Sequence, residues 1–324
     1  MAEGPSRRRV LAFSALTGAA AFGGVWLAGR TIGRTGSPAL WGADGAAGEV
    51  LLFDLELSIL RRIQLPGLRR IFGAGSGQLW AWLTPARGAQ EVLRLGLDGD
   101  VVDRIPLEGS RDVVASKEDA LFVLSEGGRV SEVRVGSHRS CLSLPWADGL
   151  CPFGDGILAF GEGRIVRFAT GRRTGIVASA RFEGRAVACA PIAGRFFLTA
   201  QRGSETEVLL LNEKLRSEFA LRLSGEMLSL TADRMGNAWG LLTRTDRLVR
   251  IASTGRVDVS PPNVLPHGAC LLRWSADTLF VALWGAVLRF DGAADWPQPL
   301  PMAHPQRSQG GFSRLVGLVP IGIR

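Results

Sequence analysis

A short apolar pair recurs along the sequence at intervals of about 40 residues, and this period constrains the fold more than any other feature. Each pair follows a turn segment, usually one with Gly, Asp or Asn, and successive pairs are 39, 42, 36, 39, 42 and 41 residues apart. Such regular spacing indicates one supersecondary unit per repeat and a stack of similar units. The seven pairs are Leu40-Trp41, Leu79-Trp80, Leu121-Phe122, Ile157-Leu158, Phe196-Phe197, Ala238-Trp239 and Leu279-Phe280.

Within one repeat, four short apolar segments alternate with turn residues. The unit over residues 111–145 reads RDVVAS, ALFVLSE, RVSEVRV and CLSLP. Residues 35–324 show no helical period with caps, so each segment is predicted to be a strand. About ten residues after the pair, four of the five clearest copies carry Arg at the third strand position: Arg94, Arg167, Arg250 and Arg289. Alternation at period two places that Arg on the opposite face from its neighbours.

Seven units of four antiparallel strands predict an all-β fold, a seven-bladed β-propeller. A lone four-stranded sheet cannot bury both faces, whereas blades packed around an axis cover one another. The first pair, at Leu40, lacks a preceding inner strand. Residues 311–318 repeat the Gly-then-strand element, so we predict that they close the ring as the innermost strand of the first blade. Two domains with a break near residue 150 are the alternative, which the uninterrupted period disfavours.

The repeat resembles the broad class of bacterial seven-bladed propellers related to NHL and YVTN repeats, through units of the form G-x-L-W, V-L-R-L and D-G-x-V-V. The resemblance covers residues 38–322 and implies an architecture, not one activity.

The N-terminus carries a run of 20 residues without a charge, Val10 to Gly29, with arginines on both sides. At about 1.5 Å per residue a helix of this length just crosses a hydrocarbon core of about 30 Å. We therefore predict one transmembrane helix, with a buried core helix as the alternative. The expected domains are a signal or transmembrane anchor at 1–31, a linker at 32–38 and the propeller at 39–324.

The segment Ser6 to Ala12, SRRRVLA, resembles the bacterial twin-arginine export signal, with Arg7 and Arg8 as its arginine pair. This resemblance implies export of the folded protein. An uncleaved anchor is favoured over a removed peptide, because no small-residue cleavage site fits well. The expected location is the bacterial cytoplasmic membrane, single-pass through the N-terminal helix, with the propeller on the periplasmic or extracytoplasmic side.

Charge and motif content exclude several classes of function. Half of the net charge of +8 belongs to the first 34 residues, and the arginine pairs elsewhere are scattered, which disfavours nucleic acid as a partner. Four cysteines without a CxxC motif are too few for a disulfide scaffold. No HExxH or nucleophile motif occurs, so no catalytic residue, metal site or cofactor is predicted. This motif content disfavours an enzyme.

Five residues fall in loops predicted to form one mouth of the propeller channel: Arg69, Arg111, Arg185, Glu226 and His267. The arginines can receive an acidic partner, although each residue can also be an ordinary solvated loop side chain. We therefore predict a binding or scaffold module for a protein or envelope component, with any small-molecule ligand undefined. The alternatives are a metal-dependent hydrolase of the lactonase type, with its site in the channel, and an accessory subunit of a membrane electron-transfer complex.

Overall fold

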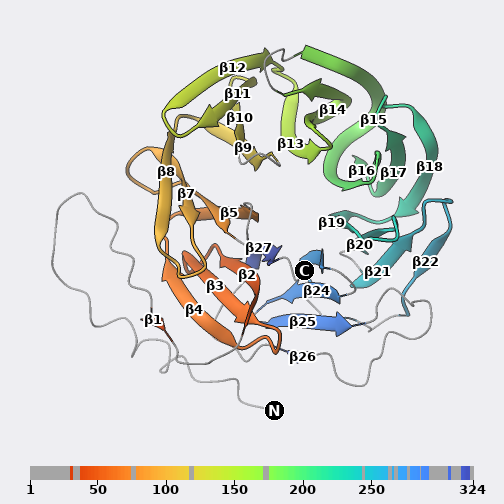
Figure 1. Ribbon diagram of the computed structural model, residues 1–324. Coiled ribbons are helices and arrows are strands. Elements are labelled where there is room, and N and C mark those ends of the chain that lie inside the picture. Colours follow the sequence, from red (N-terminus) through yellow and green to blue (C-terminus); the bar gives the residue numbers. More distant parts are fainter. Residues whose placement is uncertain are drawn as a thin grey trace.

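The computed structural model shows a ring of β-sheets around a central axis (Figure 1). It describes residues 30–31, 37–73, 78–116, 120–170, 175–242, 245–261, 265, 269–275, 278–284, 286–291, 306–307 and 315–321. Every regular element in these ranges is a strand, which confirms the predicted all-β propeller.

The described strands form six hydrogen-bonded sheets, which follow one another around the ring in chain order. The first contains β1 (Arg30–Thr31), β2 (Pro38–Asp44), β3 (Glu49–Asp54), β4 (Ile59–Gln64) and β27 (Leu315–Pro320). The second contains β5 (Leu68–Gly73), β6 (Leu79–Leu83), β7 (Gln90–Leu95) and β8 (Val101–Leu107). The third contains β9 (Ser110–Ala115), β10 (Leu121–Ser125), β11 (Arg129–Arg134) and β12 (Ser137–Ser143).

The remaining three sheets continue the ring. The fourth contains β13 (Ala147–Phe153), β14 (Gly156–Ala169), β15 (Gly175–Ile192), β16 (Arg195–Arg202), β17 (Glu205–Asn212) and β18 (Ser217–Ser224). The fifth contains β19 (Met227–Ala232), β20 (Ala238–Leu242), β21 (Arg247–Ile251) and β22 (Val257–Val259). The sixth contains β23 (Leu271–Ser275), β24 (Thr278–Leu283), β25 (Ala286–Asp291) and β26 (Gln306–Arg307).

The third sheet shows how closely the repeat pattern matches the strands. The segments RDVVAS, ALFVLSE and RVSEVRV correspond to β9, β10 and β11. β12 begins at Ser137, four residues before the predicted segment CLSLP, and overlaps it at residues 141–143. The four strands pair in chain order as an antiparallel meander. The predicted four-stranded unit is therefore confirmed for this sheet.

The number of blades differs from the prediction: with each continuous sheet counted as one blade, the propeller has six, and the prediction of seven is wrong. The fourth sheet holds six strands because two adjacent repeats share β15. The first part of β15 pairs with β14 and its last part pairs with β16. Arg185 is the point of transfer, since it is paired with Glu162 on one side and Gln201 on the other. Two sequence repeats thus join into one sheet without a break in the hydrogen-bond ladder.

The ring is closed by a C-terminal strand, as predicted, and β27 overlaps the predicted segment 311–318 at residues 315–318. Residues 311–314 lie outside the described residues. β27 pairs antiparallel with β2, in a register that places Trp41 opposite Val319 and Gly42 opposite Leu318. A Cβ atom at Gly42 would lie 2.9 Å from the Phe53 ring and 3.2 Å from Leu315. The absence of a side chain at residue 42 therefore lets these two large residues pack closely beside β2.

Apolar clusters fill the spaces between neighbouring layers of the ring. One cluster joins the sixth sheet to the first, through Phe280, Phe53 and Leu315. Another lies inside the fourth sheet, where Phe153 and Ile165 pack against Phe196. The two halves of that sheet therefore face each other as two packed layers.

The recurring strand arginine has a structural partner. Arg94 lies opposite Trp80 on the neighbouring strand, with its guanidinium carbon 5.7 Å from the ring centroid. Arg250 lies in the same way opposite Trp239, at 5.9 Å. Both distances are within the range of cation–π contacts. In these two repeats the Arg therefore covers the aromatic member of the apolar pair. Arg167 instead lies over the ring of Phe153.

Most of the predicted N-terminal anchor and export signal, including Arg7 and Arg8, lies outside the described residues. Arg30 and Thr31, the last two residues of that predicted segment, form β1 beside β4. No helix in the described residues is long and apolar enough to cross a membrane. The predicted transmembrane helix, Val10 to Gly29, lies outside the described residues.

Closure by β27 predicts a large difference between two adjacent residues of that strand. Leu315 is 1% exposed and packs between the first and sixth sheets, whereas Val316 is 40% exposed. We expect Leu315→Ala to lower the free energy of unfolding by about 2–5 kcal/mol, because it leaves a cavity where the ring closes. Val316→Ala should change it by less than about 0.5 kcal/mol. Urea unfolding monitored by tryptophan fluorescence measures both, and equal effects would contradict the closing role of β27.

Candidate functional site

A cavity of about 940 Å³ lies at the axis of the ring, bounded by its innermost strands. β5, β9, β13, the last part of β15, β19, β23 and β27 all contribute to its wall. Many segments distant in the sequence therefore converge on one space. This cavity is the candidate functional site, because ligands of ring-shaped folds reach several elements at once only near the axis.

Four of the five residues predicted to form the channel mouth line this cavity: Arg69, Arg111, Arg185 and Glu226. His267 lies outside the described residues. The three basic residues therefore line one cavity, and both their place at a shared mouth and their role in binding stay predictions.

Arg111 and Arg185 are joined through Asp148. The Arg111 Nη1 atom lies 3.4 Å from Asp148 Oδ1, and the Arg185 Nε atom lies 3.3 Å from Asp148 Oδ2. Arg111 also donates hydrogen bonds to the Ala147 and Glu126 carbonyl oxygens, each at 2.8 Å. Arg111 therefore fastens loops at the mouth, while Arg185, whose side chain is 69% exposed, keeps most of its surface toward solvent.

Arg69 has a different environment. Its guanidinium carbon lies 4.3 Å from the centroid of the Trp82 ring, and the side chain is exposed. No carboxylate within the described ranges is in ion-pair contact with it. Stacking on Trp82 holds the guanidinium in place and leaves its hydrogen-bond donors available to a ligand.

The sequence did not single out the ion pair between Arg70 and Asp112, on β5 and β9. Arg70 Nη1 donates to Asp112 Oδ1 at 2.7 Å. The Asp112 carboxylate also accepts hydrogen bonds from the backbone N–H of Val113 at 2.9 Å and of Leu150 at 2.8 Å. Burial nevertheless raises the pKa of Asp112 above its usual range, against the opposing effect of Arg70. This carboxylate links three inner strands across two sheet boundaries.

Arg273, on β23, is a further cationic group that sequence reasoning missed. Its Nε atom donates to the Leu318 carbonyl oxygen at 3.3 Å, and no carboxylate of the described residues pairs with it. Burial against the neighbouring protein atoms, and next the positive charge of Arg70, lower the pKa of the Arg273 guanidinium. Part of the side chain is nevertheless exposed to the channel. A guanidinium remains protonated at neutral pH, so Arg273 presents a positive charge to the cavity. The sequence feature that could have identified it is an Arg within an otherwise apolar inner strand, LLRW.

Cys151 and Cys189 also line the cavity, from β13 and β15. Burial, followed by a hydrogen bond with Cys151, raises the pKa of the Cys189 thiol well above its usual range. This thiol is therefore neutral at pH 7, and the pair acts as small apolar wall residues.

The charges of the cavity wall favour an anionic ligand. Five arginines line it, against the three carboxylates Asp112, Asp148 and Glu226. Arg69 and Arg273 are the two with no carboxylate partner among the described residues. No group of three or more His, Cys, Asp and Glu side chains with metal-binding geometry is found in the described ranges.

Comparison with known proteins supports the fold and nothing finer. No protein-family model matches the chain, and no curated protein sequence matches it. Among solved structures it is similar to a streptogramin B lyase, with 12% identity, a TM-score of 0.60 and coverage of 80% of this chain and 94% of that one. It is also similar to apo AztD from Citrobacter koseri, with 10% identity, a TM-score of 0.64 and coverage of 88% and 99%. The chain thus shares the β-propeller fold of these proteins.

The environment of Asp112 predicts a pH dependence of stability. A carboxyl group whose pKa is raised by folding binds its proton more tightly in the folded state. Its contribution to stability is therefore complete below pH of about 3.8 and is lost as pH rises through the raised pKa. We expect the difference in free energy of unfolding, wild type minus Asp112→Asn, to fall over this interval.

Urea unfolding at a series of pH values from about 3 to 7 measures this difference, with Asp100→Asn as the control for an exposed carboxylate. A difference for Asp112→Asn that rises with pH would contradict the assigned direction of the pKa shift.

Proposed function

We propose that the protein is a binding module whose axial cavity receives an acidic segment of a protein partner. The observation that carries this proposal is the excess of arginines over carboxylates in one cavity, with Arg69 and Arg273 unpaired by any carboxylate among the described residues. Charge-assisted hydrogen bonds to guanidinium groups are among the stronger polar contacts of proteins, particularly with carboxylates.

The distribution of the charges favours a peptide segment over a small anion. Arg69 lies on β5, Arg185 on β15 and Arg273 on β23, so the cationic groups come from different sheets around the axis. One small anion contacts one or two such groups, whereas a segment with several carboxylates can contact them together. Apolar wall residues such as Ile71, Leu272 and Val316 offer additional surface to its side chains.

A structural framework surrounds these donors. Asp112 and Asp148 hold Arg70, Arg111 and Arg185 in place. Preorganised side chains lose less conformational entropy on binding, which favours affinity. The hydrolase and electron-transfer alternatives have no comparable observation of their own.

The proposal is tested with a fluorescein-labelled octaglutamate peptide and fluorescence anisotropy. We expect saturable binding that weakens as salt is raised, because the contacts are ionic. The double substitution Arg69→Gln with Arg273→Gln should weaken binding by about tenfold or more, since it removes two charged donors. Neither side chain has an ion pair to lose within the part of the chain that the structure describes, so the fold should be retained.

The matched control is Arg222→Gln, which removes an exposed arginine on the outer strand β18, away from the cavity. It should leave octaglutamate affinity unchanged. Failure of octaglutamate to bind, equal binding of an octalysine peptide, or an unchanged affinity of the double variant would overturn the proposal.

A further inference from the structure

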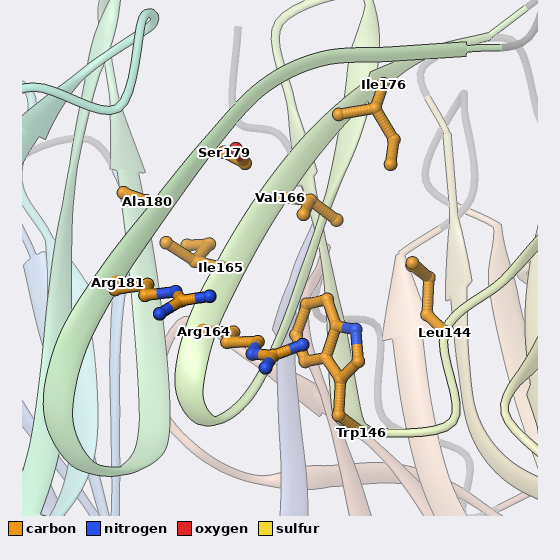
Figure 2. A pocket seen from close by; sticks show the side chains of 9 residues that line it. All are labelled: Leu144, Trp146, Arg164, Ile165, Val166, Ile176, Ser179, Ala180 and Arg181. Carbon is orange, nitrogen blue, oxygen red and sulfur yellow. The ribbon is translucent and has the colours of Figure 1, made fainter.

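A second cavity, of about 310 Å³, lies beside the seam between the third and fourth sheets (Figure 2). It shares no lining residue with the axial cavity. Leu144, Trp146, Val166 and Ile176 supply apolar surface, and Arg164 and Arg181 supply two guanidinium groups. Figure 2 shows the two arginine side chains next to each other, with Arg164 beside Trp146. This cavity combines an apolar wall with a paired positive charge.

The two arginines occupy an unfavourable arrangement for an unliganded sheet. Arg164 on β14 lies directly opposite Arg181 on β15 in the strand register. Like charges at directly opposed positions destabilise a sheet pair. Neither side chain forms an ion pair within the described residues, and both are exposed.

Two other outer strand pairs of the ring place opposite charges at such positions, whereas Arg30 lies opposite Arg62 on β1 and β4. Arg62 has a carboxylate partner in Glu49. Glu132 lies opposite Arg139 on β11 and β12, and the two side chains form an ion pair. Glu207 lies opposite Arg222 on β17 and β18, with an ion-pair distance of 3.9 Å. Within the described residues, the Arg164–Arg181 pair therefore lacks the carboxylate partner that Arg139, Arg222 and Arg62 have.

We propose that this cavity binds a carboxylate carried by an apolar group, with the carboxylate between Arg164 and Arg181 and the apolar group against Trp146 and Ile176. A carboxylate offers two acceptor oxygens, one for each guanidinium, and neutralises the repulsion between them. The volume is at the small end of the range of ligand pockets, about 300–1,000 Å³, so one ring or one large side chain fills it. The ligand class is a small apolar carboxylic acid or the terminal carboxylate of a peptide that ends in a large apolar residue.

Two probe pairs distinguish these sources by isothermal titration calorimetry on the full chain. The first pair is 4-phenylbutyrate and its neutral amide. The second is acetyl-Gly-Gly-Phe with a free and with an amidated C-terminus. We expect the free carboxylate of at least one pair to bind at least about tenfold more tightly than its amide, because the amide loses the ionic contacts. The pair that binds identifies the source.

The decisive variant is Arg181→Glu. It recreates the opposite-charge arrangement of Glu132 with Arg139, so its thermal unfolding midpoint should equal or exceed that of the wild type. The affinity for the carboxylate probes should fall by at least about tenfold, because the introduced carboxylate forms an ion pair with Arg164 and repels the ligand. Arg222→Gln is the control for binding and should leave carboxylate affinity unchanged.

The proposal would be overturned by no binding of either carboxylate at millimolar concentration, by equal binding of acid and amide, or by full binding to Arg181→Glu. Tighter binding of inorganic phosphate than of both carboxylates would also overturn it, since the apolar wall would then have no part. Octaglutamate binding in the axial cavity should be unaffected by Arg181→Glu, so the two sites succeed or fail separately.

Discussion

The pairing of β27 with β2 is the contact on which the rest of the ring depends. Without this pairing the first sheet would lack its innermost strand, and the cluster of Leu40, Phe53 and Leu315 would face solvent. Each sheet buries both faces only when it has a neighbour on each side, so the whole ring requires this one closure. The same strand also forms part of the axial cavity through Val316 and Leu318. Stability and the geometry of the candidate site therefore share one element.

The sequence predicted the repeating unit well because its signal is local. Alternation within the segments and turn residues between them are sufficient to place β9, β10, β11 and β12. Closure was also predictable, since residues 311–318 copy an element that the first repeat lacks. The number of blades was not, because it depends on whether a ladder continues across a connection. The segment Phe182-Glu183-Gly184 resembles other connections in sequence, yet Arg185 pairs on both sides and joins two repeats. The sequence period therefore predicts the number of repeats that pack around the ring, but it does not predict which neighbouring repeats share one continuous hydrogen-bonded sheet.

The candidate site was predictable only in outline. Position in the repeat placed Arg69, Arg111 and Arg185 at one mouth, because equivalent loops of a ring lie on the same side. The pairing of Arg70 with Asp112 depends on contacts across a sheet boundary, 42 residues apart in sequence. The opposition of Arg164 and Arg181 depends on the register of β14 and β15, which a single residue of slip would change. Contacts between distant segments and exact strand registers are the features that are hardest to predict from a single sequence.

The many arginines of this chain differ in how far the fold already uses them. Arg94 and Arg250 cover buried tryptophans, and Arg111 donates hydrogen bonds to two backbone carbonyls, so the fold already uses these three side chains. Arg69 and Arg273 combine a fixed position with the absence of a carboxylate partner in the described residues. Arg164 and Arg181 are brought to directly opposed positions by the strand register. A fixed guanidinium with unused donors costs less to bind than a flexible one, because its conformational entropy has already been lost. On this physical ground, our binding proposals rest on the arginines that the fold positions but does not neutralise, and not on the total positive charge of the chain.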